Sequence, residues 1–558
     1  MMDSSYASEL YAERREVKNW IELDGVSLTL SNIRALCRNS HDAKLGQAIN
    51  SRDFFDKSCK VLRHQLDAGA KIYGVNTMFG GLANQAAENP TELQKALVCA
   101  HMSGAGKPLP QNVVKIAMYL RANSLCHGTS AIRKEVVDRY IELANQDITP
   151  LVQELGSIGA SGDLIPLSAI AGAVTGQSER FKLLLNGQYL PCTQVLSRLN
   201  LSPIALKEKE GLALINGTSC LTAIAAKNAL DFVTLFDLHL KLQVAFCEIM
   251  QVDTRPFDDF IHQHRPHPGQ LWVAKVMRLG LESSEMLRVR EEVEKDFANQ
   301  SLIQDRYSLR CIPQFLGAIL EDFVVSKRSI EIEMNSATDN PLIDTVQERF
   351  LHGGNFLGQH MAMSMDRMRV NLALLAKHNE AQVAQLVEPA FSGGLSASLV
   401  APHYVGQCLG VKPLQILSNS LAPLLEQKSS PLSVHFPVYA EQFNQNLNSQ
   451  GFGSAQLTQD SIQLLAKHMA ATSLIAVQAI ALKAQQLGKP VEACFGTHSK
   501  ELYLECRKLL LQQDSDSEFV CQPQNHGRYS EFVEILSESM LNGELMSSQP
   551  FLDDSISF

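Results

Sequence analysis

Residues Leu155-Gly-Ser-Ile-Gly-Ala-Ser-Gly-Asp-Leu164 place a glycine at every third position, at Gly156, Gly159 and Gly162, around an Ala-Ser-Gly tripeptide. Glycine has no Cβ, so it permits backbone conformations and close approaches that other residues resist, and it destabilises a helix interior. The run therefore predicts neither regular helix nor regular strand. It indicates a glycine-dense turn in which the backbone itself is the candidate reagent.

Three familiar motifs do not match this turn. The dinucleotide-binding pattern needs G-x-G-x-x-G, whereas these glycines are spaced three and three. A Walker loop needs Lys after its second glycine, but Asp163 follows Gly162. The serine-hydrolase elbow G-x-S-x-G fails because Gly162 directly follows Ser161. From residue chemistry alone, a tight turn between two packed elements is the favoured interpretation.

The run from Gly156 to Asp163 resembles the motif of the aromatic amino-acid ammonia-lyases and their related aminomutases. The resemblance implies that Ala160, Ser161 and Gly162 cyclise and lose water to form 4-methylideneimidazol-5-one (MIO), an electrophilic prosthetic group made from the chain. It implies no metal and no nucleotide cofactor. It also implies a homotetramer with shared active sites that acts on a small aromatic amino acid.

Composition is typical of a globular protein, since 45% of the 558 residues are hydrophobic and 19% are charged. The formal net charge is −10 and no long basic run is present, which argues against nucleic acid or an anionic membrane as a partner. The N-terminal residues are polar and charged, unlike a secretory signal. No apolar run approaches the roughly 20 residues of a membrane span. We therefore expect a cytoplasmic protein.

Cysteine and histidine spacing gives no metal prediction. The twelve cysteines contain no C-x-x-C pair, which argues against a zinc ribbon or a disulfide framework and favours reduced, buried thiols. The cluster His262-x-His264-x-x-His267 is a candidate ligand set, but it lies in a Pro- and Gly-containing stretch without a nearby Cys. A solvent-facing loop is the favoured interpretation of that cluster.

The fold class that we predict is mainly α, a long near-parallel helix bundle with a smaller mixed α/β N-terminal region. Runs without helix breakers predict long helices, and the run over 221–250 would be about 45 Å long at 1.5 Å per residue. A hairpin over 181–190, turning at Asn186-Gly187, is the one notable sheet that we expect. The predicted helices cover 110–126, 129–145 (capped by Thr129-Ser130), 221–250, 314–334, 358–388 and 454–487.

We expect three regions. Residues 1–205 carry the lid loop and the prosthetic-group tripeptide, 206–510 form the long central helix bundle, and 511–558 form a C-terminal helical segment with a loose tail. Small residues along the 454–487 helix allow close approach of another helix, in the chain's own core or in a subunit interface. The implied homotetramer favours the interface. These residues are Ala466, Ala470, Ala471, Ala476, Ala479 and Ala481.

Eliminating ammonia from an aromatic amino acid requires an electron acceptor for a poor leaving group and a base for a weakly acidic β-proton. By resemblance, Tyr73 in Tyr73-Gly-Val-Asn-Thr-Met-Phe-Gly-Gly81 is the catalytic loop tyrosine. A phenol has a pKa of about 10, so a base of this kind needs nearby positive potential, which helix N-termini can supply. Without the motif, Tyr73 would be a packing residue.

Other site residues follow from the same resemblance. Asn216, in Glu210-Gly-Leu-Ala-Leu-Ile-Asn-Gly-Thr-Ser219, would hold the imidazolone oxygen or the substrate amine; otherwise it forms a turn. Arg310 would grip the substrate carboxylate as a fork, or else make a surface salt bridge. Tyr307 would assist proton or amine handling, or else pack in the core. The resemblance also assigns Leu164, Gln304 and Phe356 to the substrate pocket.

Four residues resemble the phenylalanine-lyase pattern and argue against an imidazole substrate: Lys412, Ile416, Glu441 and Gln445. Histidine lyases have a carboxylate where Gln445 falls. One pair departs, because phenylalanine lyases usually have Phe-Leu where this chain has Ala100-His101. His101 would bond a substrate phenol or imidazole, and an unpaired imidazole against plain phenyl would cost about 1–3 kcal/mol. Alternatively, His101 turns to a backbone partner and Ala100 enlarges the pocket.

The resemblance covers about residues 20–500 and implies a carbon–nitrogen lyase. The expected reaction is non-oxidative elimination of ammonia from phenylalanine and/or tyrosine, which gives trans-cinnamate or p-coumarate. Three alternatives stay open from the sequence. They are a histidine ammonia-lyase that forms urocanate, an aromatic 2,3-aminomutase that returns the amine at the β-carbon, and a catalytically inactive helical scaffold.

Overall fold

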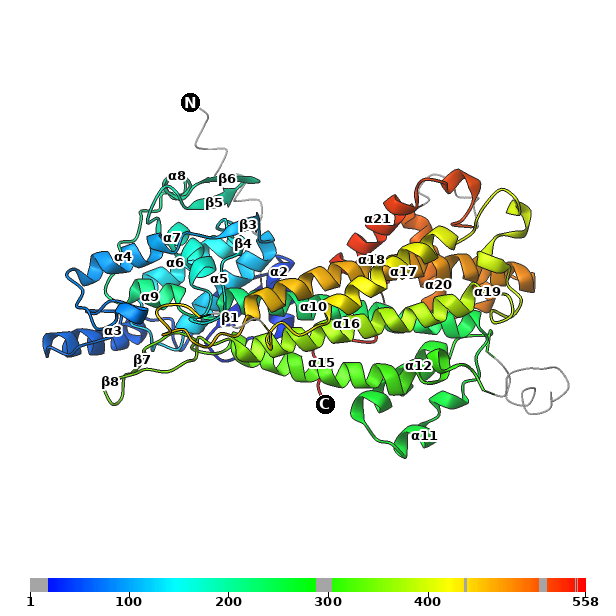
Figure 1. Cartoon of the computed structure of the whole chain (residues 1–558), viewed down its shortest axis with the longest axis horizontal. Coiled ribbons are helices and arrows are strands. Elements are labelled where there is room, and N and C mark those ends of the chain that lie inside the picture. The colour runs from blue at the N-terminus through cyan, green and yellow to red at the C-terminus, as the bar shows by residue number, and fades with distance from the viewer. Residues whose placement is uncertain (1–18, 288–303, 436–438, 511–518, 547, 549) are drawn as a thin grey trace, which may run out of the picture. The chain divides into compact units, whose positions relative to one another are not determined.

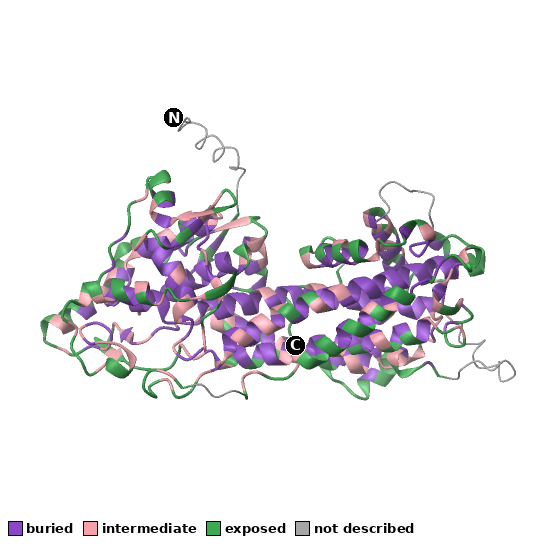
Figure 2. Cartoon of the chain, turned by 45° about the horizontal axis from the view of Figure 1, so that its top comes forward, coloured by how far each residue is buried: buried purple, intermediate pink, exposed green. Residues whose placement is uncertain are grey.

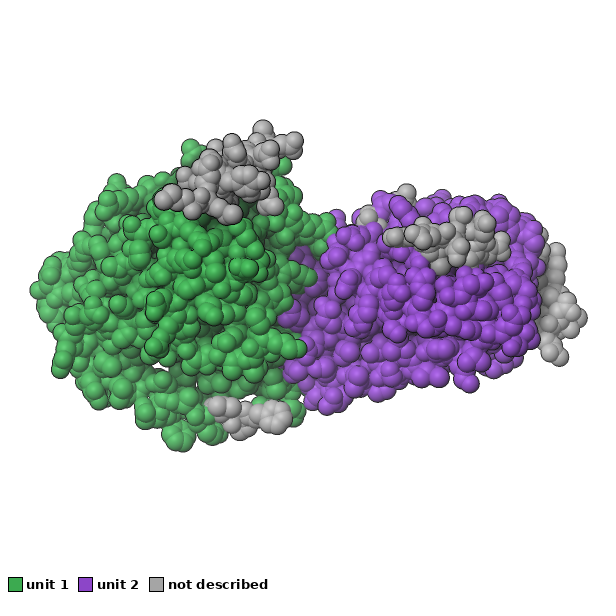
Figure 3. All heavy atoms as spheres, turned by 90° about the horizontal axis from the view of Figure 1, so that it is seen from above, with its two compact units in different colours: residues 1–227, 328–365, 431–456 green, residues 228–327, 366–430, 457–558 purple. Residues whose placement is uncertain are grey.

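The computed structural model describes residues 19–287, 304–435, 439–510, 519–546, 548 and 550–558, and these residues are mainly α-helical, as predicted (Figure 1). They divide into two compact units, coloured green and purple in Figure 3. Unit 1 comprises Met1–Lys227, Arg328–Met365 and Pro431–Gln456, and unit 2 comprises Asn228–Lys327, Asp366–Ser430 and Leu457–Phe558. The polar N-terminal residues 1–18 and the acidic run 512–518 lie outside the described residues.

Unit 1 contains short helices and all the described strands. Its helices are α2 (Leu30–Cys37), α3 (Arg52–Asp67), η1 (Gly80–Leu82), α4 (Pro90–Ala100), α5 (Gln111–Leu125), α6 (Lys134–Asn145), α7 (Leu164–Thr175), α8 (Cys192–Arg198) and α9 (Glu210–Ile215). Its strands are β1 (Asn19–Leu23), β2 (His41–Leu45), β3 (Ala105–Pro108), β4 (Gln153–Leu155), β5 (Lys182–Leu185), β6 (Gln188–Pro191), β7 (Leu342–Asp344) and β8 (Arg349–Leu351).

Four long helices contribute residues to both units: α10 (Ser219–Ile249), α15 (Ile312–Met334), α16 (Gln359–Leu386) and α18 (Gly451–Leu487). The remaining described helices belong to unit 2. They are η2 (Arg255–Phe257), α11 (Asp259–Gln263), α12 (Pro268–Leu281), α14 (Tyr307–Arg310), η3 (Ala397–Leu399), η4 (Pro402–Tyr404), α17 (Lys412–Lys428), α19 (Val491–Cys494), α20 (Thr497–Leu510), η5 (Pro523–Asn525) and α21 (Tyr529–Asn542).

The predicted long helices are confirmed to within a few residues at each end. One start differs for a clear reason: α15 begins at Ile312 and includes Pro313, because the first helical turn has no use for the N–H that proline lacks. The cap predicted for α6 is wrong. That helix begins at Lys134, and Ser130 Oγ instead donates to Asp339 Oδ1 at 2.8 Å.

The expectation of a single sheet is also wrong, since the strands of the described residues pair into four two-stranded sheets. The predicted hairpin β5–β6 is present, and Asn186 and Gly187 adopt φ of 50° and 77°, as its tight turn requires. The other pairs are β1 with β2, in parallel, and β3 with β4 and β7 with β8, both antiparallel. Pairs this short carry too little alternation to be found from sequence.

Buried residues line the long helices and also fill the short helices of unit 1, such as α5 and α9 (Figure 2). The six alanines of α18 are at most 4% exposed in the single chain, so packing within the chain accounts for them, and the predicted interface is not needed to explain them. By length and mean hydropathy α18 could cross a membrane, contrary to our expectation that no run comes close. Its most apolar window is 89% buried inside the protein, as in a core helix.

Three smaller expectations can be compared with the structure. All twelve cysteines are free thiols, as predicted, and eight of them are buried, whereas four are half-buried: Cys37, Cys59, Cys99 and Cys311. Two residues of the His262 cluster, His264 and His267, are exposed between helices, as the solvent-facing loop predicted, whereas His262 lies in α11 with its ring buried and bonded to the Pro256 carbonyl at 3.0 Å. The C-terminal tail, which we expected to be loose, is anchored where it begins, since the N–H groups of Phe551 and Leu552 donate to Asp237 Oδ1 at 2.6 and 2.9 Å.

Candidate active site

The glycine-dense turn connects β4 to α7 in unit 1, with the tripeptide just before the helix. Gly162 has φ of 71°, and a Cβ at this position would lie 2.1 Å from the Gly217 carbonyl oxygen. The Asp163 N–H donates to that same oxygen at 2.7 Å. Residue 162 must therefore be glycine for two reasons, its left-handed conformation and the backbone packed against it.

Two predicted site residues contact Ser161 directly. Asn216, at the end of α9, donates from Nδ2 to the Ser161 carbonyl oxygen at 2.9 Å. Gln445 donates from Nε2 to Ser161 Oγ at 3.0 Å. The side chain and the carbonyl of Ser161 are thus each held by an amide, while Ala160 and Gly162 are buried on either side.

Asp163 holds the turn through hydrogen bonds to its side chain. The sequence did not suggest this role, although the residue directly follows the tripeptide. Its buried carboxylate accepts from Ser157 Oγ at 3.0 Å and from the Leu221 N–H at 2.7 Å. Leu221 lies in the first turn of α10, so the start of that long helix is tied to the tripeptide. Burial raises the pKa of Asp163 to about 7.

The buried guanidinium of Arg121 packs against the Asn216-Gly217-Thr218 segment. A Cβ on Gly217 would come within 2.2 Å of Arg121 Nη1 and 2.6 Å of Thr338 Oγ1. Arg121 also donates to Thr338 Oγ1 at 3.3 Å and to the Ala213 carbonyl. Nothing in the local sequence distinguishes Arg121, because its partners come from distant parts of the chain. It fixes a guanidinium close to the backbone that contacts Gly162.

Tyr73 lies in a loop, as predicted, and its Oη accepts a hydrogen bond from the Gly80 N–H at 3.0 Å. Its ring meets those of Phe79 and His352 edge-on, with centroids 6.4 and 6.1 Å away. Burial raises the pKa of Tyr73 above its usual value, the Gly80 hydrogen bond opposes this, and Glu441 adds to it. The lowering by positive potential that we expected is therefore not seen within the described chain.

A strained loop at residues 440–445 contacts both the Tyr73 loop and the tripeptide. Residues 441, 442 and 443 all have positive φ, between 48° and 66°, and none is glycine. Ala440 and Gln445 close this loop through two backbone hydrogen bonds of 3.3 and 3.2 Å. Glu441 Oε2 accepts from the Gly81 N–H at 3.4 Å, whereas Gln445 reaches Ser161. One short loop thus contacts both the candidate base loop and the candidate prosthetic group.

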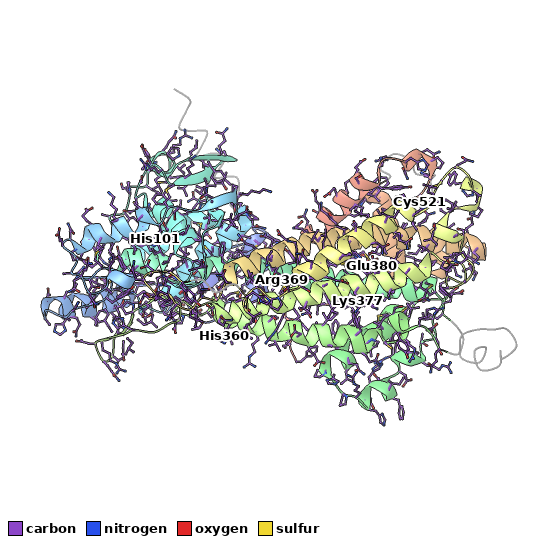
Figure 4. The ribbon with its side chains drawn as sticks, in the orientation of Figure 1. His101, His360, Arg369, Lys377, Glu380 and Cys521 are labelled. Carbon is purple, nitrogen blue, oxygen red and sulfur yellow. The ribbon has the colours of Figure 1, made fainter. Side chains whose placement is uncertain are left out.

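His101 follows the last residue of α4, where Figure 4 labels it. Its Nδ1 donates to the Leu97 carbonyl at 2.8 Å, as the backbone-partner alternative predicted. Because a carbonyl only accepts, Nδ1 carries the proton, and in the neutral ring Nε2 is a hydrogen-bond acceptor. Ala100 is exposed beside it, and Leu164 and Phe356 are half-buried elsewhere in unit 1.

The other predicted residues belong to unit 2. Tyr307 is 73% exposed, which excludes core packing, and the Arg310 guanidinium carbon lies 4.6 Å from the centroid of its ring. Among the described residues Arg310 makes no ion pair, and its buried Nε has no hydrogen-bond partner. Lys412 and Ile416 are exposed on α17, and Gln304 is exposed before α14. The exposed side chains of Gln304, Tyr307, Lys412 and Ile416 are thus available to a ligand or to another chain.

Two surface hollows lie in the described part of the chain, and the one in unit 2 is lined by Pro413 and Leu417, the sequence neighbours of Lys412 and Ile416. One in unit 1, of about 550 Å³, lies between α6 and the 202–207 segment; the other in unit 2, of about 400 Å³, lies between α17 and α21. Neither is lined by a predicted site residue. The candidate site is therefore described by the contacts among its residues.

Comparisons with known proteins identify the family of the chain. The aromatic amino acid lyase family model matches residues 28–508. A phenylalanine ammonia-lyase of Nostoc punctiforme is 40% identical over 481 residues, 86% of this chain and 84% of that protein. An aromatic ammonia-lyase of Loktanella atrilutea is 37% identical over 470 residues, 83% of this chain and 85% of that protein.

A solved structure shows the same fold. The phenylalanine aminomutase of Pantoea agglomerans superposes with a TM-score of 0.84 at 28% identity, covering 94% of this chain and 98% of that one. The family predicted from residues 156–163 is thus confirmed. The chain belongs to the aromatic amino acid lyase family.

Proposed function

We propose that this chain is a carbon–nitrogen lyase that eliminates ammonia from phenylalanine and/or tyrosine, giving trans-cinnamate or p-coumarate. The observation that carries the proposal is the Ala-Ser-Gly tripeptide, whose Ser161 is held by the amides of Asn216 and Gln445. The similarity to a phenylalanine ammonia-lyase at 40% identity supports the reaction class.

The residues present fit an MIO group built from the tripeptide. A ring closed between the Ala160 carbonyl carbon and the Gly162 nitrogen keeps the Ser161 carbonyl as its exocyclic oxygen. Asn216 already donates to that oxygen, and Gln445 donates to the Ser161 hydroxyl that would leave as water. Closure and dehydration release two waters in all. The group supplies an electrophile that draws electrons from the substrate's amine or ring.

The chain's own residues divide the remaining work. Tyr73 Oη accepts the β-proton, and the Gly80 N–H stabilises the phenolate by donating to the same atom. Arg310 binds the substrate carboxylate with its unused donors, and Tyr307, which the guanidinium covers, handles a proton or the amine. The pocket is completed by Leu164, Phe356, Gln304, Lys412, Ile416 and Glu441.

The substrate preference rests on two positions. Gln445 presents a neutral amide where histidine lyases have a carboxylate, which favours a carbocyclic ring over imidazole. His101 Nε2 is left as an acceptor by the Nδ1 bond to Leu97, so it suits the hydroxyl donor of tyrosine. We propose that the protein is cytoplasmic. We also propose a homotetramer with shared sites, because the five unit 2 residues of the site, which lie on or beside α14 and on α17, are at most half-buried and can contact another chain.

The test is turnover of phenylalanine, tyrosine and histidine side by side, monitoring cinnamate, coumarate, urocanate and any β-amino acid. We expect the first two products, and urocanate or a β-amino acid as the main product would overturn the proposal. Ser161→Ala serves as the control. Wild type should differ from it in near-ultraviolet absorbance and should weigh two waters less than its sequence mass, whereas absence of both differences would favour an inactive scaffold.

A further inference from the structure

A buried polar cluster lies in unit 2 against the short helix that carries Tyr307 and Arg310. Its side chains are His239 and Gln243 from α10 and His378 and Gln382 from α16, and none is more than 6% exposed. Figure 4 labels Lys377 and Glu380, which flank His378 along α16. Four polar groups buried between helices destabilise a protein unless hydrogen bonds compensate them, so their partners matter.

Two of these side chains converge on one backbone atom. His378 Nε2 and Gln382 Nε2 each donate to the Ser308 carbonyl oxygen at 2.8 Å. Ser308 is the second residue of α14, which is only four residues long. The last carbonyls of a helix lack helical donors, and a single turn has little stability of its own. Side chains of α16 therefore hold α14 in place.

The rest of the cluster fixes the orientation of the His378 ring. With Nε2 donating to Ser308, the neutral ring offers Nδ1 as an acceptor, and His239 Nε2 lies 3.1 Å from it. The Phe315 ring packs against His378 with centroids 5.1 Å apart. Burial lowers the pKa of His378 to about 4, so the ring is neutral near pH 7. Gln382 also donates to Gln243 Oε1, which restricts the second donor.

We propose that His378 and Gln382 are positioning residues: by holding the Ser308 carbonyl, they set the position from which Arg310 binds the substrate carboxylate. The inference rests on the carboxylate-binding role proposed above for Arg310. It is supported by the unused Arg310 donor two residues beyond Ser308, and by the contact of that guanidinium with the Tyr307 ring. A cluster that served packing alone would have no reason to affect ligands according to their carboxylate.

The test compares His378→Leu, which removes the donor, with His378→Gln, which keeps an N–H donor like that of Gln382. Measured quantities are KM and kcat for the preferred amino acid, and Kd for cinnamate and for 2-phenylethylamine, which lacks a carboxylate. We expect His378→Leu to raise KM and the cinnamate Kd about tenfold, the size of one lost hydrogen bond. The 2-phenylethylamine Kd should stay within about twofold, and His378→Gln should recover most of the loss.

Gln385→Leu is the matched control, because Gln385 is buried on the same helix and its Oε1 has no partner. It should leave KM and both Kd values unchanged. If His378→Leu does not fold, as judged by circular dichroism, Gln382→Leu replaces it with the same expected pattern. Equal weakening of both ligands, or an unchanged KM, would overturn the positioning role. Failure of wild type to release ammonia would instead overturn the proposed function, and the two failures are distinct.

Discussion

The two groups of candidate site residues differ in how the chain holds them. Around the tripeptide in unit 1, backbone packs on backbone, and Gly162 has no room for a single carbon atom. In unit 2, Tyr307, Lys412 and Ile416 are exposed on helix surfaces, and Arg310 is half-buried. The first group has the rigidity that an intramolecular cyclisation needs. The second has the accessibility that substrate binding needs.

The sharpest test of this contrast is Gly162→Ala, which we expect to abolish turnover. The new Cβ would collide with the Gly217 carbonyl, so the turn must shift away from the geometry that cyclisation requires. Gly187→Ala is the matched control, because Gly187 has a similar φ of 77° with nothing within 4 Å. It should be destabilised by about 1 kcal/mol but keep its activity and near-ultraviolet absorbance. An active Gly162→Ala variant would contradict the inference that cyclisation requires this rigid turn.

A second prediction concerns Asp163, whose pKa of about 7 in the folded protein is above the ordinary value of 3.8. Between these values the unfolded chain releases a proton that the folded protein retains, so the free energy of unfolding falls as pH rises from about 4 to 7. The effect is at most about 4 kcal/mol, at 1.36 kcal/mol per pKa unit. Denaturant melts of wild type and Asp163→Asn should differ in this slope, and parallel curves would argue against a protonated Asp163.

Tyr73→Phe should reduce turnover by at least about 10²-fold, the usual contribution of an acid–base group. Since the pKa of Tyr73 lies above its ordinary value, the phenolate fraction grows with pH, and wild-type kcat/KM should rise through the alkaline range. That rise should be absent in Tyr73→Phe. The near-ultraviolet absorbance should be retained, because Tyr73 is not part of the tripeptide. Turnover near that of wild type would remove Tyr73 as the base.

The sequence predicted the elements whose signal is local. The glycine spacing at 156–162 identified the tripeptide, and the lack of Pro and Gly over long stretches predicted α10, α16 and α18. It did not predict contacts between distant residues. Arg121 under Gly217, Asp163 at the start of α10, and His378 against Ser308 each join segments far apart in the chain. The strained loop at 441–443 also has no local pattern, because non-glycine residues seldom adopt positive φ.

The smallest expected effect concerns His101 and would sharpen the contrast between group formation and substrate choice. His101→Phe removes the Nε2 acceptor, so the ratio of kcat/KM for phenylalanine over tyrosine should rise about tenfold, as for one hydrogen bond. His101→Gln keeps an acceptor oxygen and should retain most of the tyrosine activity.

Both His101 variants lose the bond from Nδ1 to the Leu97 carbonyl, so any common loss of stability belongs to the end of α4 and not to the ring. Near-ultraviolet absorbance should not change in either variant, because His101 lies outside the contacts that hold Ser161. The comparison of Phe with Gln therefore isolates the hydrogen bond to the substrate. If both variants keep the wild-type ratio of kcat/KM for phenylalanine over tyrosine, His101 only ends its helix, and substrate choice depends on residues such as Gln445.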